Sequence, residues 1–177
     1  MRKFFAVLAA SVVAMVAAPA TAVAETLGPL DITVVYNGRC LDAHSGMLHQ
    51  NGTPVQLWDC LGPGQLNQQW YVQRVSYYSE YRIINAANGR CLDVHRGAIH
   101  QNGTPVQLWD CLGDNQLNQI WQLYWNSRYH EYIFRNKASG RVLDAHLGAI
   151  NQNGTPVQLW DNYGDLQFNQ RWRWLDW

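Results

Sequence analysis

Apolar and polar residues alternate along several short stretches of this chain. Leu41/Ala43, Val55/Leu57 and Trp70/Val72 each have polar or small neighbours between or beside them, the period-two pattern of half-buried strands. Turn residues separate the stretches, including Gly46 and the Asn51-Gly52 dipeptide. No stretch has a convincing helical period. The pattern predicts four short strands per repeat unit, about twelve in all, and an all-β barrel or sandwich.

The strand pattern recurs because the chain repeats itself every 51 residues. The sequence at 40–44 returns at 91–95 and 142–146, and the block Asn-Gly-Thr-Pro-Val-Gln-Leu-Trp-Asp recurs at 51–59, 102–110 and 153–161. Between the first two copies, 24 of the 31 positions from 40 to 70 are identical. Such units bury their apolar faces on one another, so the period predicts a fold with pseudo-three-fold symmetry.

The first 24 residues are typical of a secretory signal peptide. Two basic residues at 2–3 precede an apolar run at 4–18, and the small residues at 22–24 form a cleavage site. The apolar run is shorter than the roughly 20 residues of a membrane span. We therefore expect a secreted, extracellular protein with a signal peptide (1–24) and one domain (25–177), whose repeats span approximately 28–78, 79–129 and 130–177.

Charge and aromatic content narrow the choice of partner. Removal of Arg2 and Lys3 leaves 11 basic against 13 acidic residues, without the basic clusters of nucleic-acid or anionic-membrane binders. Nine Trp and nine Tyr provide flat apolar surfaces of the kind that pack against sugar rings. We expect a monomer that binds glycans or polysaccharide, with no nucleic acid, no membrane insertion and no cofactor.

The cysteines agree with export. The third repeat has Val142 and Asn162 where the first two repeats have cysteines, so both members of a pair are absent together. This co-loss predicts the disulfides Cys40–Cys60 and Cys91–Cys111. A Cys/His zinc site is the alternative, but it lacks close Cys spacing and suits an exported chain poorly.

The side-chain alternation also predicts a polar face on each hairpin. If the segments at 40–44 and 56–60 pair with Cys40 opposite Cys60, then Asp42 lies opposite Trp58 and His44 opposite Gln56. These side chains would share one face, while Leu41, Ala43 and Leu57 would face the core. An indole offers an apolar platform to a sugar ring, and carboxylate and amide groups can bind its hydroxyls.

Three motifs carry a resemblance to a known family. Cys-Leu-Asp-x-His, Val-Gln-Leu-Trp-Asp-Cys and Asn-Gln-x-Trp resemble the ricin B-type lectin repeat, also known as carbohydrate-binding module family thirteen. The resemblance covers nearly all of 25–177 and implies a β-trefoil, with a six-stranded barrel capped by three hairpins. It also implies sugar-binding roles for Asp42, Asp93 and Asp144, for Gln56, Gln107 and Gln158, for Trp58, Trp109 and Trp160, and for Asn67, Asn118 and Asn169. Gln68, Gln119 and Gln170, with Trp70, Trp121 and Trp172, match the Gln-x-Trp signature and are interpreted as support and core.

Other interpretations remain open at this point. His44, His95 and His146 could form a metal site on the three-fold axis, although a hydrogen bond made by each histidine near its Asp is favoured. The Asn-Gly-Thr triplets at 51, 102 and 153 match a glycosylation signal but are interpreted as turns.

The third repeat departs from the pattern in two ways. It has no disulfide, so its site is expected to be looser, and Asn151 replaces His49 and His100 at a loop expected to flank the sugar.

Two function classes compete with a lectin. A trefoil can serve as a protein-binding scaffold, such as an inhibitor or a toxin-like ligand. A glycosidase would need two carboxylates beside one bond, and Asp42 with Asp59 is the recurring pair. Strand alternation places Asp59 on the face opposite Trp58, and Ser45 becomes Arg96 and Leu147 in the other copies, which removes a constant nucleophile. We therefore expect a non-enzymatic lectin that binds galactose- or xylose-type glycans.

Overall fold

The computed structural model describes residues 25–76, 78–164 and 166–175, so the expected signal peptide lies outside the described residues. Twelve strands are present: β1 (Thr26–Val34), β2 (Cys40–Ala43), β3 (Thr53–Trp58), β4 (Gln69–Ser76), β5 (Glu80–Asn85), β6 (Cys91–Val94), β7 (Thr104–Trp109), β8 (Trp121–Asn126), β9 (Glu131–Asn136), β10 (Val142–Ala145), β11 (Thr155–Trp160) and β12 (Trp172–Leu175). Six 3-10 turns connect them: η1 (Ser45–Met47), η2 (Leu66–Gln68), η3 (Arg96–Ala98), η4 (Leu117–Gln119), η5 (Leu147–Ala149) and η6 (Phe168–Gln170). The described part of the chain holds no helix that is long and apolar enough to cross a membrane.

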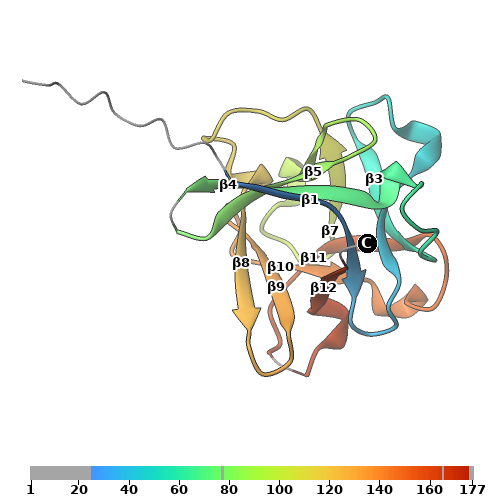
Figure 1. The fold of residues 1–177 in the computed structure, drawn as a ribbon. Helices are drawn as coiled ribbons and strands as arrows, with labels where there is room; N and C mark the ends of the chain where they lie inside the picture. The colour runs from blue at the N-terminus through green and yellow to red at the C-terminus, as the bar shows by residue number, and fades with distance from the viewer. Residues whose placement is uncertain (1–24, 77, 165, 176–177) are drawn as a thin grey trace, which may run out of the picture.

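Six strands close into a barrel (Figure 1). Each repeat contributes its first and fourth strand, and the pairs run around the ring as β1–β4, β4–β5, β5–β8, β8–β9, β9–β12 and β12–β1, all antiparallel. Closure leaves no edge strand in the barrel, so its backbone polar groups are paired within the fold.

The remaining six strands form three hairpins over one end of the barrel. The hairpins are β2–β3, β6–β7 and β10–β11, and their second strands pair with one another in a triangle of β3, β7 and β11. A six-stranded barrel with this triangular cap is a β-trefoil. The predicted all-β, three-fold repeated fold is confirmed.

The core follows the period-two pattern of the sequence. Leu41, Ala43 and Leu57 are fully buried, as predicted, and so are their equivalents in the other repeats. Trp70, Trp121 and Trp172 fill the interior, and each indole Nε1 donates to the carbonyl oxygen of the second residue of the preceding motif: Leu41, Leu92 and Leu143 respectively. These three bonds join the last barrel strand of each repeat to its hairpin.

The predicted register within the hairpins is wrong by two residues. Cys40 lies opposite Trp58 and Asp42 opposite Gln56, while the His44 amide donates to the carbonyl of Pro54. The strand pairing therefore ends at Trp58, and Cys60 lies beyond the ladder. Because the shift is an even number, the same side chains still share a face.

The two predicted disulfides are present. Cys40–Cys60 and Cys91–Cys111 have Cα–Cα distances of 5.1 and 5.0 Å, and the described residues contain no free cysteine. Each bond joins the first residue of a hairpin to the segment just past its second strand. The third hairpin keeps the same register, Val142 opposite Trp160, without such a bond.

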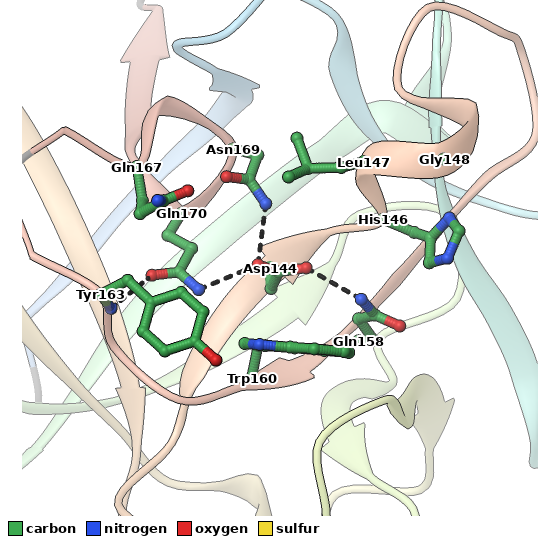
Figure 2. A pocket seen from close by; sticks show the side chains of 10 residues that line it. All are labelled: Asp144, His146, Leu147, Gly148, Gln158, Trp160, Tyr163, Gln167, Asn169 and Gln170. Carbon is green, nitrogen blue, oxygen red and sulfur yellow. Dashed lines mark hydrogen bonds between the residues drawn. The ribbon is translucent and has the colours of Figure 1, made fainter.

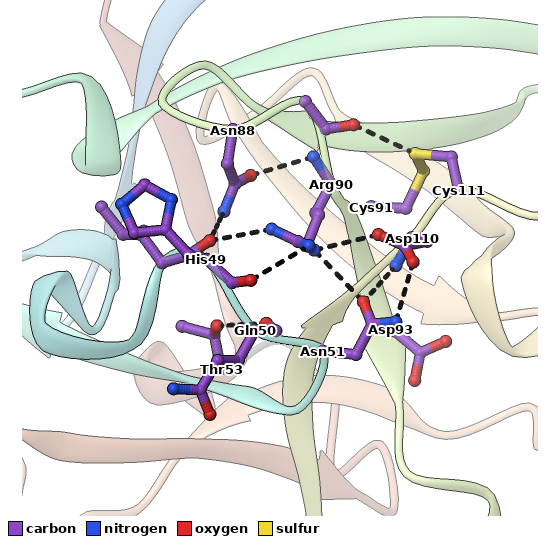
Figure 3. Close-up of polar contacts among 12 residues, drawn as sticks. His49, Gln50, Asn51, Thr53, Asn88, Arg90, Cys91, Asp93, Asp110 and Cys111 are labelled. Atoms are coloured by element: carbon purple, nitrogen blue, oxygen red, sulfur yellow. Dashed lines mark hydrogen bonds and ion pairs between the residues drawn. A yellow bond between two sulfur atoms is a disulfide. The ribbon is translucent and has the colours of Figure 1, made fainter.

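Three polar clamps join neighbouring repeats, and Figure 3 shows one of them. Asn51, in the turn before β3, donates to the Asp110 carboxylate at 2.8 Å and accepts from the Asp110 amide at 2.8 Å. Arg90 bonds both of these side chains through its Nε. The same trio recurs as Asn102, Asp161 and Arg141, and as Asn153, Asp59 and Arg39, so each repeat is bonded to the next.

The clamp explains why the Asn-Gly-Thr triplet is repeated. Gly52 has a φ of +88°, which favours glycine and lets the turn bring Asn51 toward the next repeat. The Thr53 hydroxyl lies 2.6 Å from the Met47 carbonyl oxygen and closes the same loop. The triplet is therefore a turn, as predicted, and its Asn also connects repeats.

Replacing a disulfide by the third repeat's own residues should lower stability without changing the fold. We expect Cys40→Val with Cys60→Asn to lose about 3 kcal/mol of unfolding free energy, because the unfolded chain regains the freedom of an open loop. Urea denaturation of the oxidised protein measures the loss. The equivalent pair, Cys91→Val with Cys111→Asn, should lose a similar amount because both bonds span 20 residues. Equal stability of variant and parent would contradict the prediction.

Removing a clamp asparagine should also destabilise the barrel. Asn51→Ala leaves the Asp110 amide and the Arg90 guanidinium each short of one acceptor, at a cost of about 1–2 kcal/mol. Gln50→Ala is the matched control, because the described structure gives its side chain no hydrogen bond. If the two variants unfold at the same denaturant concentration, the clamp does not stabilise the fold.

Candidate functional site

Each repeat has one hollow on the outer face of its hairpin. The first is lined by Asp42 of β2, by Gln56 and Trp58 of β3, by Asn67 of η2 and by neighbouring loop residues. The second and third are built from the equivalent residues: Asp93, Gln107, Trp109 and Asn118, and Asp144, Gln158, Trp160 and Asn169. The structure thus brings all twelve residues of the sequence-based assignment together, four to each hollow.

A buried carboxylate forms the floor of each hollow. Asp42 is only 4 % exposed, and its Oδ1 accepts from Gln56 Nε2 at 2.9 Å. Its Oδ2 accepts from Asn67 Nδ2 at 2.8 Å and from Gln68 Nε2 at 3.0 Å. The same three bonds surround Asp93 and Asp144, at 2.7–3.0 Å. The amides hold the carboxylate in one orientation.

Burial also changes the acidity of these groups. Removal from water raises the pKa of Asp42, Asp93 and Asp144 above the usual aspartate value, because it disfavours the charged form. The amide donors, and to a smaller extent the nearby histidine, lower each pKa and offset part of that rise.

Gln68 is the residue that fastens the site to the fold. Its Nε2 also donates to the Asp59 carbonyl at 3.0 Å, and its Oε1 accepts from the Leu61 amide at 2.9 Å. Both of its side-chain N–H groups and its side-chain oxygen therefore have partners inside the protein, and it is fully buried. Gln119 and Gln170 make the equivalent bonds.

The groups that remain free are mostly acceptors. Asn67 uses both of its side-chain N–H groups, on Asp42 and on the Ala43 carbonyl, whereas its side-chain Oδ1 has no partner in the described structure. Gln56 keeps one N–H and its oxygen, and Asp42 Oδ1 accepts a single bond. A ligand that donates hydroxyl protons fits such a floor.

The indoles stand at the side of each hollow. Trp58 and Trp160 are partly exposed and Trp109 is 37 % exposed, in contrast to the fully buried Trp70, Trp121 and Trp172. In the third hollow Tyr163 adds a second aromatic ring (Figure 2). The exposed faces are available to an apolar surface of a ligand.

The histidines do not behave as expected. Figure 2 shows the His146 ring pointing away from the Asp144 carboxylate, and no hydrogen bond joins His44, His95 or His146 to its Asp in the described residues. Each imidazole instead packs on the glycine of the following 3-10 turn; a Cβ at Gly46 would lie 3.0 Å from His44 Cε1. The described residues contain no group of three His, Cys, Asp or Glu side chains that could hold a metal ion.

One further expectation needs correction. His49 and Asn151 do not flank the hollows: their carbonyl oxygens accept from Arg90 and Arg39 at the clamps (Figure 3 shows His49). The residues that do vary around the hollows are at other positions, namely Ser45, Arg96 and Leu147, and Leu61, Leu112 and Tyr163. The differences among the repeats at these positions were the available sequence signal.

Comparison with known proteins agrees with this geometry. The family model for the ricin-type beta-trefoil lectin domain matches residues 66–160, more than half of the chain. The agglutinin of Ricinus communis is 28% identical over 134 residues, which are 76% of this chain and 20% of the agglutinin. Beta-galactoside-specific lectin 2 of Viscum album is 26% identical over 123 residues, 70% of this chain and 19% of that lectin. The chain thus spans about a fifth of the length of these relatives.

Solved structures show the same fold. The designed three-fold symmetric protein ThreeFoil superposes with a TM-score of 0.73 at 24% identity, over 84% of this chain and 98% of ThreeFoil. The ricin B-like lectin of Macrolepiota procera, solved with lactose, gives a TM-score of 0.65 at 18% identity, over 85% and 94% of the two chains. Because the family model matches more than half of the chain, and the fold is a trefoil of three repeats, this chain belongs to the ricin-type beta-trefoil lectin domain-like family.

Proposed function

We propose that this protein is a secreted, non-enzymatic lectin that binds galactose- or xylose-type glycans through three hollows, one in each repeat. The observation that carries the proposal is a partly exposed indole beside a buried, amide-held carboxylate in all three repeats. The indole faces the C–H side of a pyranose, and the carboxylate and amide oxygens accept from its hydroxyls. The lactose complex of the Macrolepiota procera lectin supports a glycan as the ligand class.

Each site should be weak alone. The hollows measure about 200, 240 and 200 Å³, below the roughly 300–1,000 Å³ of pockets that enclose a small molecule. Open sites of this size suit millimolar to micromolar affinity, about −4 to −8 kcal/mol. Three sites on one rigid barrel gain by avidity when the ligand is a polysaccharide or a glycan-coated surface.

The position of Asp59 supports a binding role over glycoside hydrolysis. Its carboxylate is bonded to Arg39 at 2.9 Å and to Asn153 at 2.8 Å, in the clamp between repeats. Asp110 and Asp161 have the same role. The recurring acid that could have accompanied Asp42 therefore has a structural partner in each copy.

Replacement of the indoles is the direct test, because removing Asp42 would leave the amides of Gln56, Asn67 and Gln68 without their acceptor. We expect Trp58→Ala, Trp109→Ala and Trp160→Ala each to weaken its own site roughly tenfold, about 1.4 kcal/mol. The triple variant should pass unretarded through a galactose or xylan matrix that retains the parent. Calorimetric titration with the free sugar gives the individual affinities.

The control is Trp125→Ala. Trp125 is 48 % exposed but packs on Tyr132 and His130 at the end of β8, away from the hairpin hollows. This variant should bind as the parent does. Retention of the triple variant would exclude the assigned sites, and competition by proteins but never by sugars would favour a protein-binding scaffold.

Sugar binding should also depend on pH. The raised pKa of the three aspartates means that each becomes neutral at a higher pH than an ordinary aspartate of 3.8, and a neutral acid is a poorer hydroxyl acceptor. Binding should therefore weaken, with a midpoint above 3.8, as the solution is acidified.

These groups should not themselves cause acid unfolding. A folded pKa above the unfolded value means that protonation favours the folded state, so their contribution to stability increases as pH falls through this window. Tryptophan fluorescence titrations at each pH, with circular dichroism to monitor the fold, separate the two effects. Undiminished binding down to pH 3.8 would contradict the assigned role of the carboxylates.

A further inference from the structure

One lining position makes the second hollow chemically different from the other two. The residue that follows the histidine repeated in each copy is Ser45 in the first repeat, Arg96 in the second and Leu147 in the third. Each of these residues lines its own hollow. Figure 2 shows Leu147 at this position, close to Asn169. The second repeat therefore places a permanent positive charge where the others have a hydroxyl and an alkyl group.

The charge of Arg96 is not used by the protein. Arg96 is exposed, and within the residues that the structure describes it has no ion pair, hydrogen bond or ring contact. Other arginines have such partners: Arg39, Arg90 and Arg141 hold the clamps, Arg82 pairs with Asp114, and Arg173 pairs with Glu131. The nearby Asp93 is bonded by amides, and no ion pair joins it to Arg96 within the described residues.

Another hollow, distinct from the three hairpin hollows, adjoins the hollow of the second repeat at Arg96. It measures about 360 Å³ and is lined by Arg96, Ile99, Asn115, Gln116, Leu117, Asn118 and Ala138. Arg96, Gln116 and Asn118 line both hollows, so the two are neighbours. Asn115 is also particular to this repeat, because the equivalent positions are Gly64 and Leu166.

We propose that the second repeat recognises an acidic glycan, with one sugar ring over Trp109 and the carboxylate or sulfate of the adjacent residue on Arg96. The inference rests on the proposed lectin function, since the neighbouring hollow has to hold a sugar first. The planar guanidinium can donate two parallel N–H groups to such an anion, and the Asn115 and Gln116 amides are available to the remaining oxygens and hydroxyls. The floor around Asp93 is rich in hydrogen-bond acceptors, so it admits the neutral sugar ring and not the anionic group.

The test isolates the second site in a Trp58→Ala/Trp160→Ala background. Three oligosaccharides of equal length are titrated by calorimetry: a neutral one, one with a terminal uronic acid and one with a sulfate ester. At low salt the acidic ligand of the correct class should bind roughly fivefold more tightly than the neutral one, the upper range for an exposed ion pair. The two acidic ligands identify which anion the site takes. The preference should shrink as salt is added.

Arg96→Ser, which installs the first repeat's residue, should abolish this preference and leave the affinity for the neutral ligand unchanged. Arg128→Ser is the matched control: it removes the same charge from an exposed arginine over Tyr129, at the β8–β9 turn, and should keep the preference. Equal binding of neutral and acidic ligands, or a preference that survives in Arg96→Ser, would overturn this inference alone. Failure of the neutral ligand to bind would overturn the proposed lectin function as well.

Discussion

A buried carboxylate held by three amides is the interaction on which both the hairpins and the hollows depend. Asp42 leaves water almost completely, a costly step unless donors inside the protein replace the lost water. Gln56, Asn67 and Gln68 supply those donors from β3 and η2, so satisfying the charge also joins the hairpin to the start of β4. A half-satisfied network would destabilise this region, which explains why the acid and its amides are retained in all three repeats.

This network separates residues that support the site from residues that are open to a ligand. The Gln68 side chain uses both N–H groups and its oxygen in bonds to the protein. The side-chain oxygens of Gln56 and Asn67 have no such partner in the described structure. The carboxylate can then act on a ligand without moving, because the amides have already oriented it. Such preorganisation lowers the cost of binding, which matters for an open hollow with few contacts.

The three repeats share a frame but differ at its rim. The barrel, the triangular cap and the Asn–Asp–Arg clamps are three-fold, and the third hairpin keeps its register without a disulfide. The differences at the rim include the side chains of Arg96 and Tyr163, which have no hydrogen bond or ion pair within the described residues. Packing does not constrain those positions, so the repeats can diverge there in ligand preference while the shared frame persists.

Much of this molecule was predictable from local pattern. Strand alternation is a local property, so the buried faces of Leu41 and Leu57, the outward side of Asp42 and Trp58, and the number of strands followed from the order of residues. The joint absence of two cysteines in the third repeat identified the disulfides.

Tertiary structure decided the contacts that depend on how a loop turns. The hairpin register differs by two residues because pairing ends at Trp58, a length that alternation cannot reveal. Asn51 and Asp110 are 59 residues apart, and only the closed ring of repeats brings them together. Loop direction likewise places Arg96, and not His100, beside a hollow. Periodicity determines which side a residue faces, whereas its partner across a turn or a repeat boundary is set by the packed barrel.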